Sequence, residues 1–222
     1  YIILVRHGET DFNKEGKVQG SEVDPPLNEM GIKQASLTGE FIKKHFKIDK
    51  IYSSQYKRAK QTALNIREII GYNDKILINK NLKEGDKGLL SGKDKNEVNE
   101  LFKSNIKFNN LKLKCDKYDH YEKLNAMYDN DKISKLMKKE TFREIGKRAK
   151  SVIKNIIKDN LNKNILIVTH GSFIANGIRN IFDLRQIPEK TVGNGNCSLT
   201  VIKLGNNKKE LIMSFNNIHL NE

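Results

Sequence analysis

Cysteine is scarce in this sequence, which has two cysteines, three prolines and no tryptophan among its 222 residues. Cys115 and Cys197 lie far apart and fit neither a metal-ligand spacing nor a disulfide framework, so we expect two reduced thiols in a cytoplasmic protein. Apolar runs such as Ile165–Val168 are as short as strands, whereas a membrane span needs roughly 20 apolar residues. The composition therefore argues against a disulfide-rich secreted protein and against a membrane protein.

Arginine is also scarce, although the chain is strongly basic. The formal net charge is +14, but only seven of the 41 basic residues are arginine, and the lysines are scattered with asparagines through every segment. Proteins that read bases or clamp nucleic-acid phosphates favour the planar arginine fork. We therefore attribute the charge to a general composition bias and do not expect a nucleic-acid partner, although the positive field favours anionic substrates.

The apolar pattern predicts strands that alternate with helices. Strands are expected at residues 2–5, 50–53, 76–78, 164–170, 198–204 and 211–215. Helices are expected at residues 28–46, 58–70, 142–158 and 172–180. In the first helix Asn28 is the expected N-cap, and one face should hold Ile32, Ala35, Ile42 and Phe46. This order predicts an α/β fold, a three-layer α/β/α sandwich with a mostly parallel central sheet.

We expect residues 1–222 to form a single domain that carries an insertion. Residues from about 81 to 140 are polar, weakly patterned and without a clear strand, so we interpret them as an inserted cap or lid. The sequence begins at Tyr1, inside an expected strand, and we expect it to be part of a longer product.

Two expected strands are each followed by histidine and glycine. LVRHG places His7 after the first strand, and IVTHG places His170 after a later one. In open parallel sheets, ligands bind at the carboxyl ends of strands. A single histidine in this position is usually a cap or a core residue. Two in the same context, one of them preceded by Arg6, indicate a site.

An ordered series of motifs resembles the histidine phosphatase superfamily, which includes the cofactor-dependent phosphoglycerate mutases and many phosphatases. The matching segments are RHGET with Asn13, Val18–Ala35, Tyr52–Ala63, Leu82–Gly92, THGSF, NCSLTVI and NNIHL. They span nearly the whole chain. RHG alone occurs often by chance, whereas the ordered series does not.

The resemblance implies a nucleophile and a phosphate clamp. His7 would attack phosphorus through a neutral ring nitrogen and form a phosphoramidate that water later opens. Its other ring nitrogen must keep its proton. Arg6 and Arg58 would grip the phosphate oxygens through their planar forks, and His170 would add a further donor.

The resemblance also implies a general acid. Glu84 would protonate the leaving oxygen and then activate water, which calls for a pKa raised by partial burial. Asp86 and Glu97 lie nearby and remain alternatives. No metal is required for this chemistry, and no carboxylate cluster resembles a metal site. Further substrate contacts are expected at Asn13, Gly20 and Gly171.

Phosphatase and mutase activity both begin with phosphohistidine, but a mutase must hold a bisphosphate with extra cations. No arginine occurs between Arg67 and Arg143, and Glu84 is followed by Gly-Asp-Lys-Gly. We therefore predict a phosphomonoester hydrolase that acts on a small phosphorylated metabolite without a cofactor. The alternative is a phosphoglycerate mutase that uses 2,3-bisphosphoglycerate; a silent binding module or a nucleic-acid-binding protein is a weaker one. A homodimer is common in the family.

Overall fold

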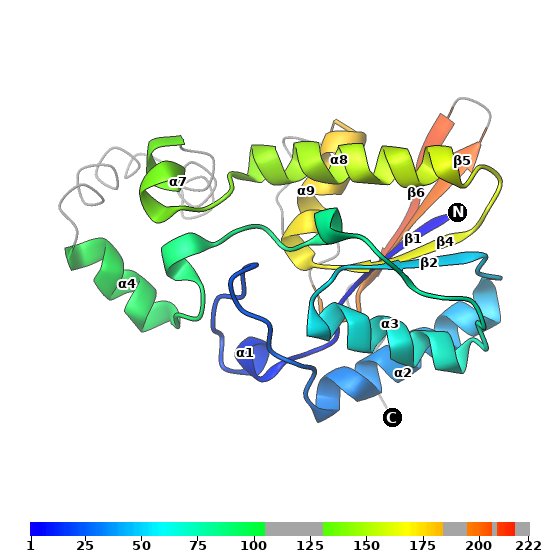
Figure 1. Ribbon diagram of the computed structural model, residues 1–222, viewed down its shortest axis with the longest axis horizontal. Coiled ribbons are helices and arrows are strands. Elements are labelled where there is room, and N and C mark those ends of the chain that lie inside the picture. The colour runs from blue at the N-terminus through cyan, green and yellow to red at the C-terminus, as the bar shows by residue number, and fades with distance from the viewer. Residues whose placement is uncertain (105–130, 184–194, 206–207, 216–222) are drawn as a thin grey trace.

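The strands form one sheet in the computed structural model, which describes residues 1–104, 131–183, 195–205 and 208–215 (Figure 1). Its strands are β1 (Ile2–Arg6), β2 (Lys50–Ser53), β3 (Leu77–Ile78), β4 (Ile165–Thr169), β5 (Leu199–Gly205) and β6 (Lys208–Phe215). They lie in the order β3-β2-β4-β1-β5-β6. The first four run parallel, and β5 and β6 continue the sheet in antiparallel pairings. The predicted α/β fold with a mostly parallel sheet is confirmed.

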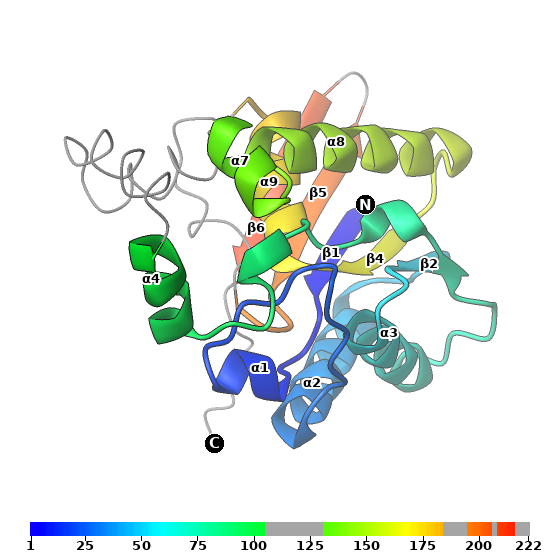
Figure 2. The ribbon, with the colours of Figure 1, turned by 60° about the vertical axis from the view of Figure 1, so that its left-hand side comes forward.

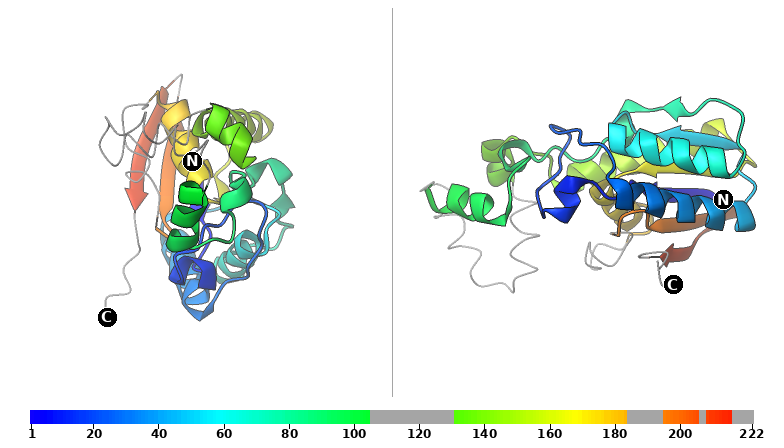
Figure 3. Two further views of the ribbon diagram at one scale, coloured as in Figure 1. Left: turned by 90° about the vertical axis from the view of Figure 1, so that its left-hand side faces the viewer. Right: turned by 90° about the horizontal axis from the view of Figure 1, so that it is seen from below.

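Helices cover both faces of this sheet. The long helices are α2 (Glu29–His45), α3 (Lys57–Ile69), α8 (Phe142–Asp159) and α9 (Gly171–Ile181). Shorter helices are α1 (Asp11–Lys14), α4 (Lys95–Ser104) and α7 (Asp131–Met137), with 3₁₀ turns η1 (Lys80–Leu82) and η2 (Gly88–Leu90). Figures 1 and 2 show α8 and α9 on one side of the strands and α2 and α3 on the other. Figure 3 shows α2 and α3 side by side.

Two apolar cores separate the three layers. On β1, Ile2 and Leu4 pack with α8 and α9, whereas Ile3 and Val5 pack with α2 and α3. Every residue of β4 is buried because helices cover both of its faces. This burial explains why the strands read as continuous apolar runs and not as alternating patterns.

Helix α2 begins where the sequence predicts, and most of the expected face is buried: Ala35 and Ile42 are fully buried, and Phe46 packs partly buried against the core. The Asn28 side chain accepts a hydrogen bond from the Gly31 N–H at 2.9 Å, which confirms the expected N-cap. Ile32 was expected on the buried face, and this prediction is wrong because its side chain is 48% exposed. Small residues are buried beside Ile42: Gly39 packs closely on Ile69 of α3, where a Cβ would meet side-chain atoms at 3.1 Å.

The expected cap is described only in part, since residues 105–130 lie outside the described residues. Within the described part of the chain, η1, η2, α4 and α7 follow β3, and α4 and α7 lie beyond the carboxyl edge of the parallel strands (Figure 1). Leu90 of η2 and Met137 of α7 form a small apolar cluster. No helix of the described residues has the length and apolar character of a membrane span.

Candidate active site

Three neighbouring strands deliver polar side chains to the carboxyl edge of the sheet. Strands β2, β4 and β1 lie side by side and are followed by Ser54, His170 and His7. Because β1 and β4 pair in register up to Arg6 and Thr169, the two histidines stand at the same level. Their ring centroids are 5.3 Å apart. The structure therefore brings together the two histidines that the repeated strand-His-Gly pattern singled out.

The hydrogen bond of His7 and its lowered pKa together indicate a neutral ring and one tautomer. Its Nδ1 lies 2.8 Å from the Gly8 carbonyl oxygen. Since a carbonyl oxygen only accepts, Nδ1 carries the proton and Nε2 keeps its lone pair. Burial, followed by the charges of Arg58 and Arg6, lowers the pKa of His7 well below its ordinary value. The arrangement leaves an unprotonated nitrogen beside two guanidinium groups.

His170 is fixed by a residue that the sequence analysis missed. Its Nε2 lies 2.8 Å from the Ser54 hydroxyl, while its Nδ1 is buried and has no hydrogen-bond partner among the described residues. Burial, followed by Arg58 and His7, lowers the pKa of His170 well below its ordinary value. Ser54 directly follows β2, as each histidine follows its own strand, so the same pattern could have identified it.

Arg58 is completely buried and holds a loop as well as facing the site. Its Nη1 donates to the Val23 carbonyl at 2.9 Å, and its Nη2 donates to the Gly20 carbonyl at 3.3 Å. Asp24 lies 3.7 Å from Nη1. Burial lowers the pKa of Arg58, while the charge of Glu84 opposes this shift. Among the described residues, Arg58 Nε has no partner and remains available as a donor.

Glu84 lies against the start of α9. Its side chain is buried, and its two carboxylate oxygens accept the backbone N–H groups of Gly85 at 2.7 Å and Ser172 at 3.3 Å. Burial lowers the pKa of Arg6, and the charge of Glu84 opposes this shift most strongly. A Cβ on Gly171 would lie 3.4 Å from Arg6 Nε. Thus Glu84, Arg6 and the first turn of α9 surround one space.

Asp86 is less suited than Glu84 to donate a proton. Burial acts to raise the pKa of Asp86, but hydrogen bonds from Lys83 and Ser21 together hold it below its ordinary value. The ion pair with Lys83 favours the ionised form of Asp86, which has no proton to give. The other alternative, Glu97, lies in α4, where its carboxylate accepts the Asp94 N–H at 2.8 Å.

Asn13 is tied to the backbone of the histidine loop. Its Oδ1 accepts from the Thr10 N–H at 3.2 Å and from Asn196 Nδ2 at 3.0 Å. Asn196 Nδ2 also donates to the His7 carbonyl at 3.2 Å. The Asn13 amide nitrogen has no acceptor among the described residues, so it remains a neutral donor. Gly20 lies close to the Lys87 stem, where a Cβ would meet Lys87 carbons at 2.8 Å.

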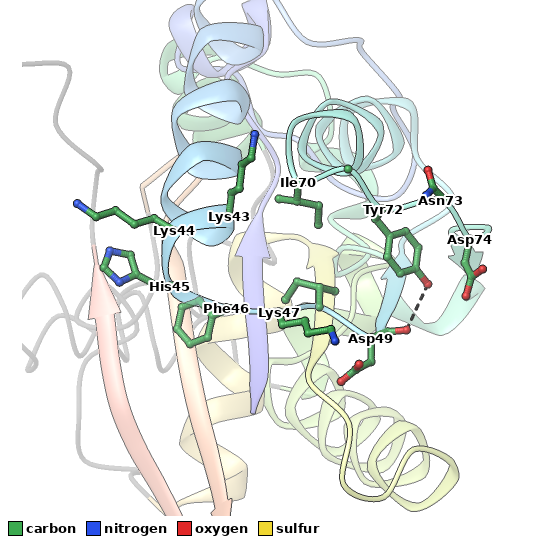
Figure 4. A pocket seen from close by; sticks show the side chains of 12 residues that line it. Lys43, Lys44, His45, Phe46, Lys47, Asp49, Ile70, Tyr72, Asn73 and Asp74 are labelled. Carbon is green, nitrogen blue, oxygen red and sulfur yellow. Dashed lines mark hydrogen bonds between the residues drawn. The ribbon is translucent and has the colours of Figure 1, made fainter.

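A cavity lies away from these residues. It has a volume of about 690 Å³ and lies between the ends of α2 and α3, beside Asp49 at the amino end of β2 (Figure 4). Its polar lining consists of Lys43, Lys44, His45, Lys47, Asp49, Tyr72, Asn73 and Asp74. It contains none of the predicted site residues. In the described part of the chain, no group of three or more His, Cys, Asp or Glu side chains is placed to hold a metal ion.

Acid is expected to destabilise the fold, because His7 and His170 are buried as neutral rings. Both have pKa values well below the ordinary 6.5 in the folded chain. Below about pH 6.5 the unfolded chain therefore binds more protons, and the free energy of unfolding decreases as the pH falls. The decrease should approach about 2.7 kcal/mol per pH unit, about 1.4 for each ring, until the folded-state pKa values are reached. Urea unfolding over a pH series measures this slope.

A matched pair of variants shows which histidine causes the dependence of the unfolding free energy on pH. His170→Asn should remove about half of it, whereas His45→Asn, on the exposed end of α2, should leave it unchanged. The same slope in both variants and in the natural chain would show that the buried histidines do not cause it.

Comparison with known proteins agrees with this geometry. Metal-independent phosphoserine phosphatase from Arabidopsis thaliana is 29% identical over 209 residues, which cover 93% of this chain and 77% of the relative. Fructose-2,6-bisphosphatase TIGAR from Xenopus tropicalis is 38% identical over 104 residues, which cover 46% of this chain and only 38% of that relative. A solved structure of a phosphoserine phosphatase mutant from Entamoeba histolytica, in complex with phosphoserine, has a TM-score of 0.73 and 27% identity, covering 96% of this chain and 95% of the other.

The family itself is shown by a match along almost the whole chain. The model of the histidine phosphatase superfamily (branch 1) matches residues 2–217. This span contains both strand-His-Gly segments, Arg58 and Glu84, and it confirms the resemblance drawn from the motifs. The chain therefore belongs to the histidine phosphatase superfamily.

Proposed function

We propose that this histidine phosphatase hydrolyses small phosphomonoesters through a phosphohistidine formed at His7. The observation that carries the proposal is the bond between His7 Nδ1 and the Gly8 carbonyl, which leaves Nε2 unprotonated near the positive charges of Arg58 and Arg6. A neutral imidazole nitrogen is the nucleophile that attack on phosphorus needs. After the attack the ring becomes positive, and the Gly8 carbonyl then stabilises the Nδ1–H.

In the first step, the bond between Nε2 and phosphorus forms as the bond between phosphorus and the ester oxygen breaks. Glu84 in its protonated form gives its proton to that leaving oxygen. In the second step, water attacks phosphorus, Glu84 takes a proton from the water, and the nitrogen–phosphorus bond breaks. Inorganic phosphate leaves, and both His7 and Glu84 return to their starting states.

Charge on the transferring phosphoryl group is stabilised by three side chains. The guanidinium of Arg6 and the Nε of Arg58 would be the cationic donors. Because both groups are held before substrate binds, they need no reorganisation during the reaction. We assign the Ser54 hydroxyl as donor to His170 Nε2, so that Nδ1–H is left to donate to a phosphoryl oxygen. Asn13 would add a neutral donor, and the Gly20 and Gly171 backbones border the same space.

Hydrolysis is favoured over the mutase alternative. The relatives described above are phosphatases, and no arginine occurs between Arg67 and Arg143. We propose that no cofactor takes part; 2,3-bisphosphoglycerate would be required only by a mutase.

For the substrate, we propose a phosphate ester whose alcohol part carries a carboxylate, with phosphoserine as the first candidate. Lys87 is buried, and its Nζ donates to the Ser172 hydroxyl at 3.1 Å. The Ser172 N–H in turn donates to the Glu84 carboxylate. The ammonium group thus lies beside the proposed acid, where the leaving alcohol would be. A relative and a solved structure named as phosphoserine phosphatases support this substrate class.

Lys87→Met is expected to raise KM for phosphoserine about 10-fold and to leave KM for propyl phosphate nearly unchanged. One charge-assisted hydrogen bond of about 1.4 kcal/mol corresponds to this factor. Steady-state phosphate release on both esters measures it. Lys95→Met, which removes the same charge from the exposed start of α4, is the control. Equal changes for the two esters would argue against a carboxylate contact at Lys87.

One preparation can test the proposed function against its alternative. Phosphate release is measured on phosphoserine, 3-phosphoglycerate, sugar phosphates and p-nitrophenyl phosphate. Interconversion of 3- and 2-phosphoglycerate is measured with and without 2,3-bisphosphoglycerate. Hydrolysis that exceeds interconversion supports the proposal. Interconversion that is much faster and depends on the bisphosphate would establish the mutase.

A further inference from the structure

The segment that carries Glu84 is held by an arginine from a different layer of the fold. Arg148 lies in α8, and its Nη1 donates to the carbonyls of Asn81 at 3.0 Å and Lys83 at 2.9 Å. Its Nη2 donates to the carbonyl of Glu84 itself at 3.4 Å. One guanidinium group therefore binds three backbone carbonyls within four residues, the last of them that of the proposed acid.

The carboxylate of Glu140 fixes the orientation of this guanidinium group. Glu140 accepts from Arg148 Nε at 3.1 Å and from Nη2 at 2.7 Å. The same Glu140 Oε2 accepts the N–H of Asp86 at 3.0 Å. The pair thus binds the backbone on both sides of Glu84. The Cζ of Arg148 lies over the ring of Phe173 in α9, 5.6 Å from its centroid, and this contact also restrains the guanidinium.

These contacts use every donor that arginine has. A guanidinium offers five N–H groups in a fixed plane, and Arg148 makes five hydrogen bonds. Lysine has three donors on one nitrogen and cannot reach the carbonyls and both carboxylate oxygens at once. The arrangement is specific to arginine, and its backbone contacts all lie in the short segment that carries Glu84.

We propose that Arg148, with Glu140, is a positioning residue that sets the place of the Glu84 carboxyl group for proton transfer to the leaving oxygen. The inference rests on the proposed function, in which Glu84 is the general acid. Its carboxylate receives only two backbone N–H groups, one of them long, so its position depends on its own backbone. A displacement of about 1 Å is enough to weaken a catalytic contact about 10²-fold.

The test compares leaving groups, because an alkoxide needs the proton and p-nitrophenolate does not. Formation of phosphohistidine is measured in rapid-quench single turnovers with phosphoserine and with p-nitrophenyl phosphate. Arg148→Lys should lower the rate about 10²-fold for phosphoserine and less than about 3-fold for p-nitrophenyl phosphate. Glu140→Gln should show the same selectivity with a smaller loss. Lys147→Gln, exposed on the same helix, should match the natural chain.

A double variant separates positioning from a structural role. If Arg148 acts through Glu84, adding Arg148→Lys to Glu84→Gln should cost less than about 3-fold more. Equal losses on both esters, or a full additional loss in the double variant, would overturn the inference while leaving the hydrolase intact. A natural chain that hydrolyses no ester would instead overturn the proposed function. Thermal unfolding of each variant identifies those that have lost the fold, and Glu140→Gln then decides the inference.

Discussion

His7→Ala is expected to abolish phosphate release, lowering kcat by at least about 10⁴-fold. The substitution removes the only atom that the proposed mechanism uses to attack phosphorus, and His170 cannot replace it because its Nε2 is bonded to Ser54. The guanidinium groups of Arg6 and Arg58 would remain in place, so substrate binding should persist while turnover is lost. Phosphate release from phosphoserine and p-nitrophenyl phosphate measures the loss.

The control for this variant is another histidine in the same chain. His45→Ala removes an exposed ring at the end of α2 and should leave kcat unchanged. Far-UV circular dichroism shows whether His7→Ala keeps the fold. A folded His7→Ala protein that retained more than about a tenth of the activity would contradict His7 as nucleophile.

Glu84→Gln is expected to lower turnover of phosphoserine by about 10²- to 10³-fold. Glutamine keeps the shape, and its single amide oxygen can still accept one of the Gly85 and Ser172 N–H groups, but it carries no transferable proton. Formation of phosphohistidine from p-nitrophenyl phosphate should be nearly unaffected, and its hydrolysis should be slow because no base activates water. Rapid-quench kinetics should therefore show a burst followed by a slow steady state.

The matched control for Glu84 is Glu97, one of the two other acids that the sequence left open. Glu97→Gln in α4 should leave both steps unchanged. If Glu97→Gln or Asp86→Asn reproduced the burst and Glu84→Gln did not, the acid would have to be reassigned.

The fold was predictable because its strands are buried on both faces. Strands such as β4 read as continuous apolar runs, and the intervening helices show one apolar face. Apolar spacing predicted the burial of Ala35 and Ile42 in α2, but not the exposure of Ile32. It also did not reveal Gly39, which is buried because α2 closely approaches Ile69 of α3 at that position.

The histidine pair was predictable for a similar reason, since parallel strands bring equivalent positions to one edge. The role of Arg58 was only partly visible: its Nη groups hold the Gly20 and Val23 carbonyls, which a motif does not reveal. Arg148 was not identified at all, because its contacts join α8 to a segment more than 60 positions earlier. Such contacts depend on tertiary packing and leave no periodic signal.

The central claim is that phosphate is transferred to His7, and the most direct measurement is to locate that phosphate. The reaction of the Glu84→Gln variant with p-nitrophenyl phosphate is stopped with alkali during turnover, because a phosphoramidate persists in alkali. Peptides of the variant are then mapped by tandem mass spectrometry. We predict an acid-labile phosphate on His7. Turnover with the phosphate on His170 or another residue, or with no covalent phosphate, would contradict it.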